Sequence, residues 1–200
     1  MGTPIALATR LLNDVQTEPI SGRALWAMGN IGPAELIAGE IKYLMPTGRL
    51  HGRIEITFAA LVLRYLLENR IGEVYTGEVG IYTRRNPDTV RAADVVYISN
   101  ERLQKTPSES YLEVAPELVV EVMSPNDRWS EVYEKIDEYF AVGVTIVLVI
   151  DPRPEFVRVY RSPDDVVRLN KTDELTLEEI LPGFRVPVAS IFSYGQPMSK

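Results

Sequence analysis

The sequence predicts a mixed α/β fold, with a central mixed β-sheet flanked by helices. Helical and strand-like hydrophobic patterns alternate along the chain, which is typical of this class. Residues 118–150 predict a strand–helix–strand unit, whose crossover is expected to be right-handed. The composition, 46% hydrophobic and 24% charged over 200 residues, is that of a globular domain of ordinary size.

The N-terminal half predicts a hairpin followed by a long helix. Residues 34–45 (AELIAGEIKYLM) favour two short strands around an Ala-Gly turn. Residues 48–69 predict a helix that stops at Gly72, because apolar side chains recur at spacings of three and four. The expected buried stripe of this helix consists of Leu50, Ile54, Phe58, Leu61 and Tyr65.

Strands are predicted over residues 73–83, 92–99 and 118–123, and the turn 124–127 (SPND) then supplies helix-capping chemistry. The next elements are a helix over 129–142, a strand over 144–150, a strand over 156–160 whose alternation suggests a sheet edge, and a short helix over 187–192. The expected buried face of the helix over 129–142 consists of Trp129, Val132, Ile136 and Phe140.

Domain organisation is predicted to be simple: an N-terminal arm (1–32), one domain (33–193) and a short C-terminal tail (194–200). The absence of cysteine excludes a disulfide framework or a cysteine zinc site, and the single histidine, His51, excludes a multi-histidine metal site. No apolar run approaches the roughly 18 residues of a membrane span, and we expect a cytoplasmic protein. The net charge of -7 disfavours a non-specific DNA binder, although metal-binding carboxylates can contribute such charge.

Two acids interrupt otherwise apolar strands: Asp94 in AADVVYIS and Glu121 in LVVEVM. Either acid could face solvent or accept a salt bridge. If both are buried in neighbouring strands, however, they repel each other unless a cation lies between them. Mg²⁺, which prefers carboxylate, carbonyl and water oxygens, is the usual cation in such a site.

Three further residues are candidates, each with a structural alternative. Lys135 could reach the end of the Glu121 strand, or form an exposed i,i+4 pair with Glu131. Glu40 could join the acids or be a solvated turn residue. His51 could face a substrate or form a surface pair with Glu55.

The order of several segments resembles the bacterial Uma family of restriction-endonuclease-like proteins. These segments are AELIAGEI, RLHGRI, EVGIYT, ADVVYIS, PELVVEVMSPNDR, EKIDEYFAVGV, VLVIDP and LPGFRVPVASIF, which together span about residues 33–193. That family is similar in fold to the PD-(D/E)xK nucleases. The resemblance implies a restriction-endonuclease-like fold, a divalent metal (Mg²⁺ or Mn²⁺) and hydrolysis of phosphodiester bonds.

The resemblance also implies roles for individual residues. Asp94 takes the place of the aspartate of the "PD" element, although Ala93 replaces the proline. Glu121 takes the place of the acid in (D/E)xK, and the carbonyl of Val122 is a further metal ligand. Glu40 is the acid of the first element. Met123 stands where the lysine is expected, and Lys135 on the following helix is the replacement.

We therefore expect a metal-dependent endonuclease that acts on nucleic acid, with DNA as the expected substrate, and that forms a homodimer. His51, Arg53 and Tyr139 are expected to contact the substrate. Arg49, Arg84 and Arg85 are further candidates for phosphate contacts, or are solvated surface. Two alternatives stay open: a catalytically degenerate interaction or regulatory module of the same fold, and a non-nuclease metal phosphodiesterase or small-molecule hydrolase.

Overall fold

The computed structural model describes residues 18–106, 109–125 and 127–193. Residues 1–17 of the predicted arm, Asn126 of the predicted turn and the predicted tail 194–200 therefore lie outside the described residues. Within the described part, no helix combines the length and the apolar character that a membrane span requires.

A small N-terminal helix, a hairpin and a long helix open the described chain, as the sequence predicts for the hairpin and the long helix. The elements in order are α2 (Gly22–Ala27), β1 (Ala34–Ile37), β2 (Glu40–Tyr43), α3 (Arg49–Asn69), β3 (Gly72–Arg84), β4 (Thr89–Ser99), α4 (Asn100–Leu103), β5 (Leu118–Val122), α5 (Trp129–Ala141), β6 (Ile146–Asp151), β7 (Phe156–Tyr160), β8 (Val166–Asn170), β9 (Glu174–Thr176), β10 (Arg185–Pro187) and α6 (Val188–Ser193).

Eight of the strands form one mixed sheet, which confirms the predicted fold class. Its order is β2-β1-β4-β5-β6-β7-β8, and β3 pairs with β4 over most of its length. Strands β5 and β6 run parallel with α5 between them in the chain, so the predicted strand–helix–strand unit is confirmed. The remaining pairs of this sheet are antiparallel.

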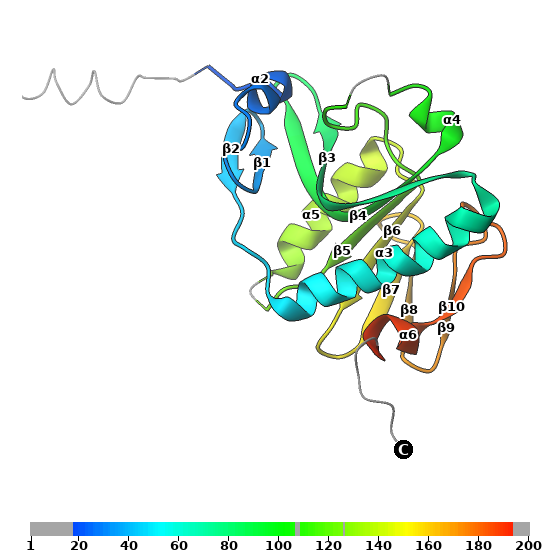
Figure 1. Cartoon of the computed structure of the whole chain (residues 1–200). Helices are drawn as coiled ribbons and strands as arrows, with labels where there is room; N and C mark the ends of the chain where they lie inside the picture. Colours follow the sequence, from blue (N-terminus) through cyan, green and yellow to red (C-terminus); the bar gives the residue numbers. More distant parts are fainter. Residues whose placement is uncertain (1–17, 107–108, 126, 194–200) are drawn as a thin grey trace, which may run out of the picture.

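Helices cover both faces of this sheet (Figure 1). Helix α3 crosses one face, where it forms a core with α6, the β9–β10 hairpin and the inward side chains of β5 and β6. Helix α5 packs on the opposite face, through Val132, Ile136 and Tyr139. Both faces of β4, β5 and β6 are thus buried, which explains their nearly continuous apolar sequences.

Helix α3 differs from its prediction at its end and in its buried face. It ends at Asn69, and Arg70 takes the left-handed conformation there (φ 51°). Gly72 instead begins β3, where a Cβ atom would lie 2.3 Å from the carbonyl oxygen of Ile98, so close strand approach requires this glycine. The predicted stripe is wrong at Leu50, which is 42% exposed. The buried face of the helix begins instead at His51 and continues through Ile54 and Phe58.

The prediction that residues 156–160 form a sheet edge is wrong. Strand β7 lies between β6 and β8, and the guanidinium of Arg158, its one half-buried position, stacks 4.1 Å from the ring of Trp129 on α5. The edge on this side of the sheet is β8, a strand that was not predicted and whose side chains are mostly exposed. Strands β9 and β10 and helix α4 were also not predicted, since each has only three or four residues.

Candidate active site

The site lies where β4 and β5 stop pairing. The last residue pair of their ladder at this end is Val95↔Val120. Beyond this pair, the Oδ2 atom of buried Asp94 accepts a hydrogen bond of 2.6 Å from the backbone N–H of Val122. A side chain thus satisfies a backbone donor that the neighbouring strand leaves free. Asp94, Glu121 and Val122 line one cavity of about 410 Å³, so the two strand acids do converge.

Both carboxylate oxygens of Glu121 contact a side chain of helix α5. Lys135 lies 3.1 Å from Oε2, and the buried hydroxyl of Tyr139 donates to Oε1 at 2.7 Å. Burial raises the pKa of Glu121 to about 7; Lys135 opposes the rise, and the charge of Asp94 adds to it. The carboxylate is therefore costly to ionise without a further positive charge.

Lys135 occupies the centre of the cluster rather than the surface. Its Nζ atom lies 3.0 Å from Glu35 and 3.1 Å from Glu121, and it donates to the carbonyl of Ala92 at 3.3 Å. Burial lowers the pKa of Lys135, but the two carboxylates outweigh it and the net pKa is raised. The structure thus favours the cluster over the exposed pair with Glu131.

Glu35 and Arg91 belong to the same cluster, although neither was predicted as a site residue. Buried Glu35 of β1 contacts both Lys135 and, at 3.1 Å, the guanidinium of Arg91 in β4. Arg91 also pairs with Glu138 of α5 at 2.6 Å. The signal was the one that identified Asp94, namely a charged residue inside an apolar strand (AELI and TVRAADVV).

Glu40 is not brought to this cluster. It begins β2 just after the turn, its side chain is 75% exposed, and the ion pair that the structure shows for it is with Lys42 at 3.2 Å. Because Glu35 pairs with Lys42 and Ile37 pairs with Glu40, both acids lie on the same face of the hairpin. Glu40 is exposed because it stands on β2, the edge strand, whereas Glu35 stands on β1, which lies between β2 and β4.

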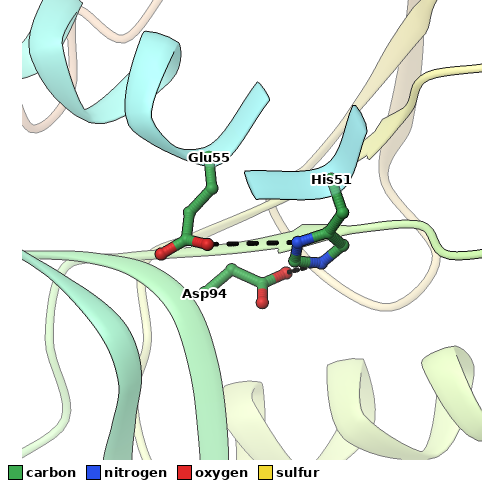
Figure 2. Close-up of side chains that lie close together, drawn as sticks. All are labelled: His51, Glu55 and Asp94. Atoms are coloured by element: carbon green, nitrogen blue, oxygen red, sulfur yellow. Dashed lines mark ion pairs between the residues drawn. The ribbon is translucent and has the colours of Figure 1, made fainter. Parts of the chain in front are cut away.

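Helix α3 contributes a second group of side chains, His51 and Glu55, one turn apart (Figure 2). The Nε2 atom of His51 lies 3.2 Å from Oδ2 of Asp94, and Nδ1 lies 3.9 Å from Glu55. The expected surface pair is wrong in its burial, because His51 is only 6% exposed. Among the described residues, Nδ1 of His51 is the buried side-chain nitrogen without a hydrogen-bond partner.

A β-bulge in β3 brings a further acid to this group. The β3–β4 register shifts between Thr76 and Val79, and both Gly77 and Glu78 have positive φ angles. The N–H of Gly77 donates to Glu55 at 3.1 Å, while Glu78 lines the cavity. Burial raises the pKa of both Glu55 and Glu78, and the nearby charge of Asp94 contributes to each rise.

The arginines fall into two groups. Arg49 and Arg53 lie in the first turns of α3, two residues to either side of the cavity-lining His51, with Arg49 exposed and Arg53 half-buried. Arg84 and Arg85 lie at the far end of β3, where Arg84 donates to Thr89 and Arg85 stacks on the ring of Tyr82. None of the four arginines is among the residues that line the cavity.

The cavity fits a divalent cation chemically. Four carboxylates line it, against one lysine; the acids are Glu78, Asp94, Glu121 and Asp127. Carboxylate oxygens are the ligands that Mg²⁺ and Mn²⁺ prefer. Nδ1 of His51 has no hydrogen-bond partner, and although burial lowers the pKa of His51, the carboxylates of Asp94 and Glu55 outweigh it and raise that pKa, so positive charge is favoured at this point.

Comparison with known proteins supports a nuclease-like fold. A crystal structure of a putative nuclease belonging to DUF820 from Anabaena variabilis superposes with a TM-score of 0.72 at 20% sequence identity. The match covers 88% of this chain and 98% of that protein. No curated protein matches the sequence.

The sequence itself matches a family profile. The Uma2 profile, described as "Putative restriction endonuclease", matches residues 25–189. This range includes β1, β4, β5, α3 and α5, and hence every residue of the cavity described above. Since the match spans most of the chain, the protein belongs to the Uma2 family of putative restriction endonucleases.

Proposed function

We propose that this protein is a metal-dependent endonuclease that hydrolyses phosphodiester bonds in DNA. The observation that carries the proposal is the convergence of Asp94, Glu121 and Lys135 on one cavity, with the lysine nitrogen 3.1 Å from the glutamate. Two acids and one cation at a sheet end are the parts that metal-assisted phosphodiester hydrolysis requires.

Mg²⁺ or Mn²⁺ would be held by the carboxylates of Asp94 and Glu121 and the carbonyl of Val122. A bound divalent ion supplies Lewis-acid activation of water and neutralises phosphate charge. The acidic cavity supports this requirement, because phosphate would otherwise meet mainly carboxylates there.

The chain's own side chains orient and balance the site. Glu35 and the carbonyl of Ala92 fix the ammonium of Lys135, so that it is preorganised to stabilise charge on the phosphate. The hydroxyl of Tyr139 fixes Glu121. We assign to Glu35 the role of first-element acid that the resemblance suggested for Glu40. Of the three expected substrate contacts, Tyr139 is fully buried, and His51 and Arg53 stay candidates.

A direct test uses supercoiled plasmid with Mg²⁺ or Mn²⁺, compared with EDTA. The expected result is nicking or linearisation that is lost in Glu121→Gln and Lys135→Ala. Glu101→Gln and Lys105→Ala are matched controls, because these two residues form an exposed pair on and next to α4. Equal cleavage by Glu121→Gln and the control would refute the assignment.

The rival function is a catalytically degenerate module of the same fold. Met123 at the usual lysine position favours it, whereas the placement of Lys135 favours an enzyme. The midpoint of thermal unfolding with added Mn²⁺ distinguishes the enzyme from the degenerate module. A metal-binding enzyme is stabilised as the Mn²⁺ concentration rises above the Kd, so its midpoint should increase. An unchanged midpoint together with no cleavage of any DNA would support the degenerate module.

A further inference from the structure

A buried nitrogen in the cavity is not explained by the oxygen ligands proposed above. Nδ1 of His51 has no hydrogen-bond partner, although the side chain is only 6% exposed. It points at Glu55, as Figure 2 shows, across 3.9 Å. That separation is too long for a hydrogen bond, so burial removes this nitrogen from water without giving it another partner.

The other ring nitrogen is already engaged. Nε2 of His51 lies 3.2 Å from Asp94, so in a neutral ring Nε2 carries the hydrogen and Nδ1 presents a lone pair. A lone pair facing a carboxylate is repulsive. A positive charge between Nδ1 and Glu55 removes this repulsion, and the gap accommodates two bonds of about 2 Å each, as in imidazole and carboxylate metal sites.

We propose that His51 Nδ1, Glu55 and Asp94 form a mixed nitrogen–oxygen site for a first-row transition metal ion. One atom from each of the three residues lies within 4.8 Å of the others. The proposal rests on the proposed function to the extent that Asp94 belongs to both ligand sets. Its new content is an imidazole ligand, and hence a preference for transition metal ions over Mg²⁺, which selects oxygen.

The surrounding side chains support a cation here. Glu78 adds a third carboxylate beside Glu55 and Asp94, and the bulge holds it there in a left-handed conformation (φ 63°). The N–H of Gly77 occupies Oε1 of Glu55, while Oε2 is the atom nearest the imidazole. The free oxygen of Glu55 and the free nitrogen of His51 thus face the same point.

The test is pulsed electron paramagnetic resonance of the untagged full-length protein with Mn²⁺. Because His51 is the only histidine in the chain, an imidazole ¹⁴N coupling to bound Mn²⁺ can come only from it. We expect this coupling in the wild type. Bound Mn²⁺ without ¹⁴N coupling, or no Mn²⁺ binding, would overturn the proposal.

His51→Gln sharpens the test, since a glutamine amide reaches roughly the position of Nε2 and retains the contact with Asp94 while removing Nδ1. Calorimetry should show Mn²⁺ affinity reduced at least ~10-fold, as losses around metal sites typically produce, and Mg²⁺ affinity nearly unchanged. Glu55→Gln should also weaken Mn²⁺ binding, whereas Glu68→Gln, an exposed change on the same helix, should not. Equal losses of both ions in His51→Gln would contradict the nitrogen ligand.

These outcomes separate the inference from the proposed function. Plasmid cleavage with an oxygen-only Mn²⁺ signal would leave the nuclease intact and remove the nitrogen ligand. A ¹⁴N coupling in a protein that cleaves no DNA would leave the metal site intact and remove the nuclease. The wild-type spectrum alone decides the inference if His51→Gln fails to fold.

Discussion

The Nζ atom of Lys135 lies 3.1 Å from Oε2 of Glu121, although one residue stands on helix α5 and the other on strand β5. Tyr139, one helical turn after Lys135, binds the other oxygen of the same carboxylate. A single face of α5 thus supplies both partners of the strand acid, because residues four apart on a helix lie one above the other.

Removing the ammonium tests this arrangement. In Lys135→Ala, we expect plasmid cleavage to fall by roughly 10²-fold or more, the typical effect of losing one preorganised charge-stabilising group. Initial rates at saturating Mn²⁺ measure the effect, with circular dichroism as the check on folding. A rate within a few-fold of Lys105→Ala would show that Lys135 serves only the fold.

Arg91 is expected to stabilise the fold rather than the chemistry. Its buried guanidinium contacts buried Glu35 and half-buried Glu138, so Arg91→Ala removes an ion-pair partner from both carboxylates. We expect a loss of about 3–5 kcal/mol in the free energy of unfolding, measured by urea titration. Arg185→Ala, which breaks an exposed pair with Glu174, should cost less than about 1 kcal/mol.

Glu138 predicts a pH dependence of stability. Burial raises its pKa, but the hydrogen bonds and charge of Arg91 outweigh burial, and the net pKa is below the ordinary 4.5. A depressed carboxyl pKa stabilises the fold above pH 4.5, and this contribution is lost as the pH falls through the folded pKa.

The measurement for Glu138 compares unfolding of the wild type and Glu138→Gln between pH 7 and pH 3. The wild type should be more stable at pH 7, and the difference should shrink below pH 4.5 as the carboxyl group is protonated. Glu68→Gln, on an exposed position of α3, should give no such trend. A difference that is independent of pH would contradict the role given to the charge.

Glu78 is expected to trade stability for cation binding. Glu78→Gln removes one of the carboxylates that crowd Asp94 and Glu55, so the metal-free protein should gain stability. We expect a midpoint roughly 2 °C higher, the shift that about 0.5–1 kcal/mol produces in a domain of this size. Mn²⁺ affinity should fall in the same variant, and a lower midpoint without metal would argue against electrostatic crowding.

Much of the fold follows from local patterns. The alternation in AELIAGEIKYLM determines the first hairpin, and the apolar runs around α5 determine the parallel pair β5 and β6. The edge position of β8 was missed, because exposure of a strand depends on what pairs with it and not on its own alternation.

The site divides in the same way. Asp94 and Glu121 could be predicted because a charged residue inside an apolar strand can be recognised from the sequence alone. The exposure of Glu40 could not be predicted, since the sequence does not say that β2 is an edge strand while β1 lies inside the sheet.

The sequence by itself therefore determined the α/β class, the main elements and the acids that interrupt them, since periodicities of two and 3.6 residues encode the direction of each side chain within its own element. Only the tertiary structure decided which charges meet: Glu35 with Lys135, and His51 with Asp94. The physical reason is that distances between elements depend on packing across the whole sheet, which no local pattern records.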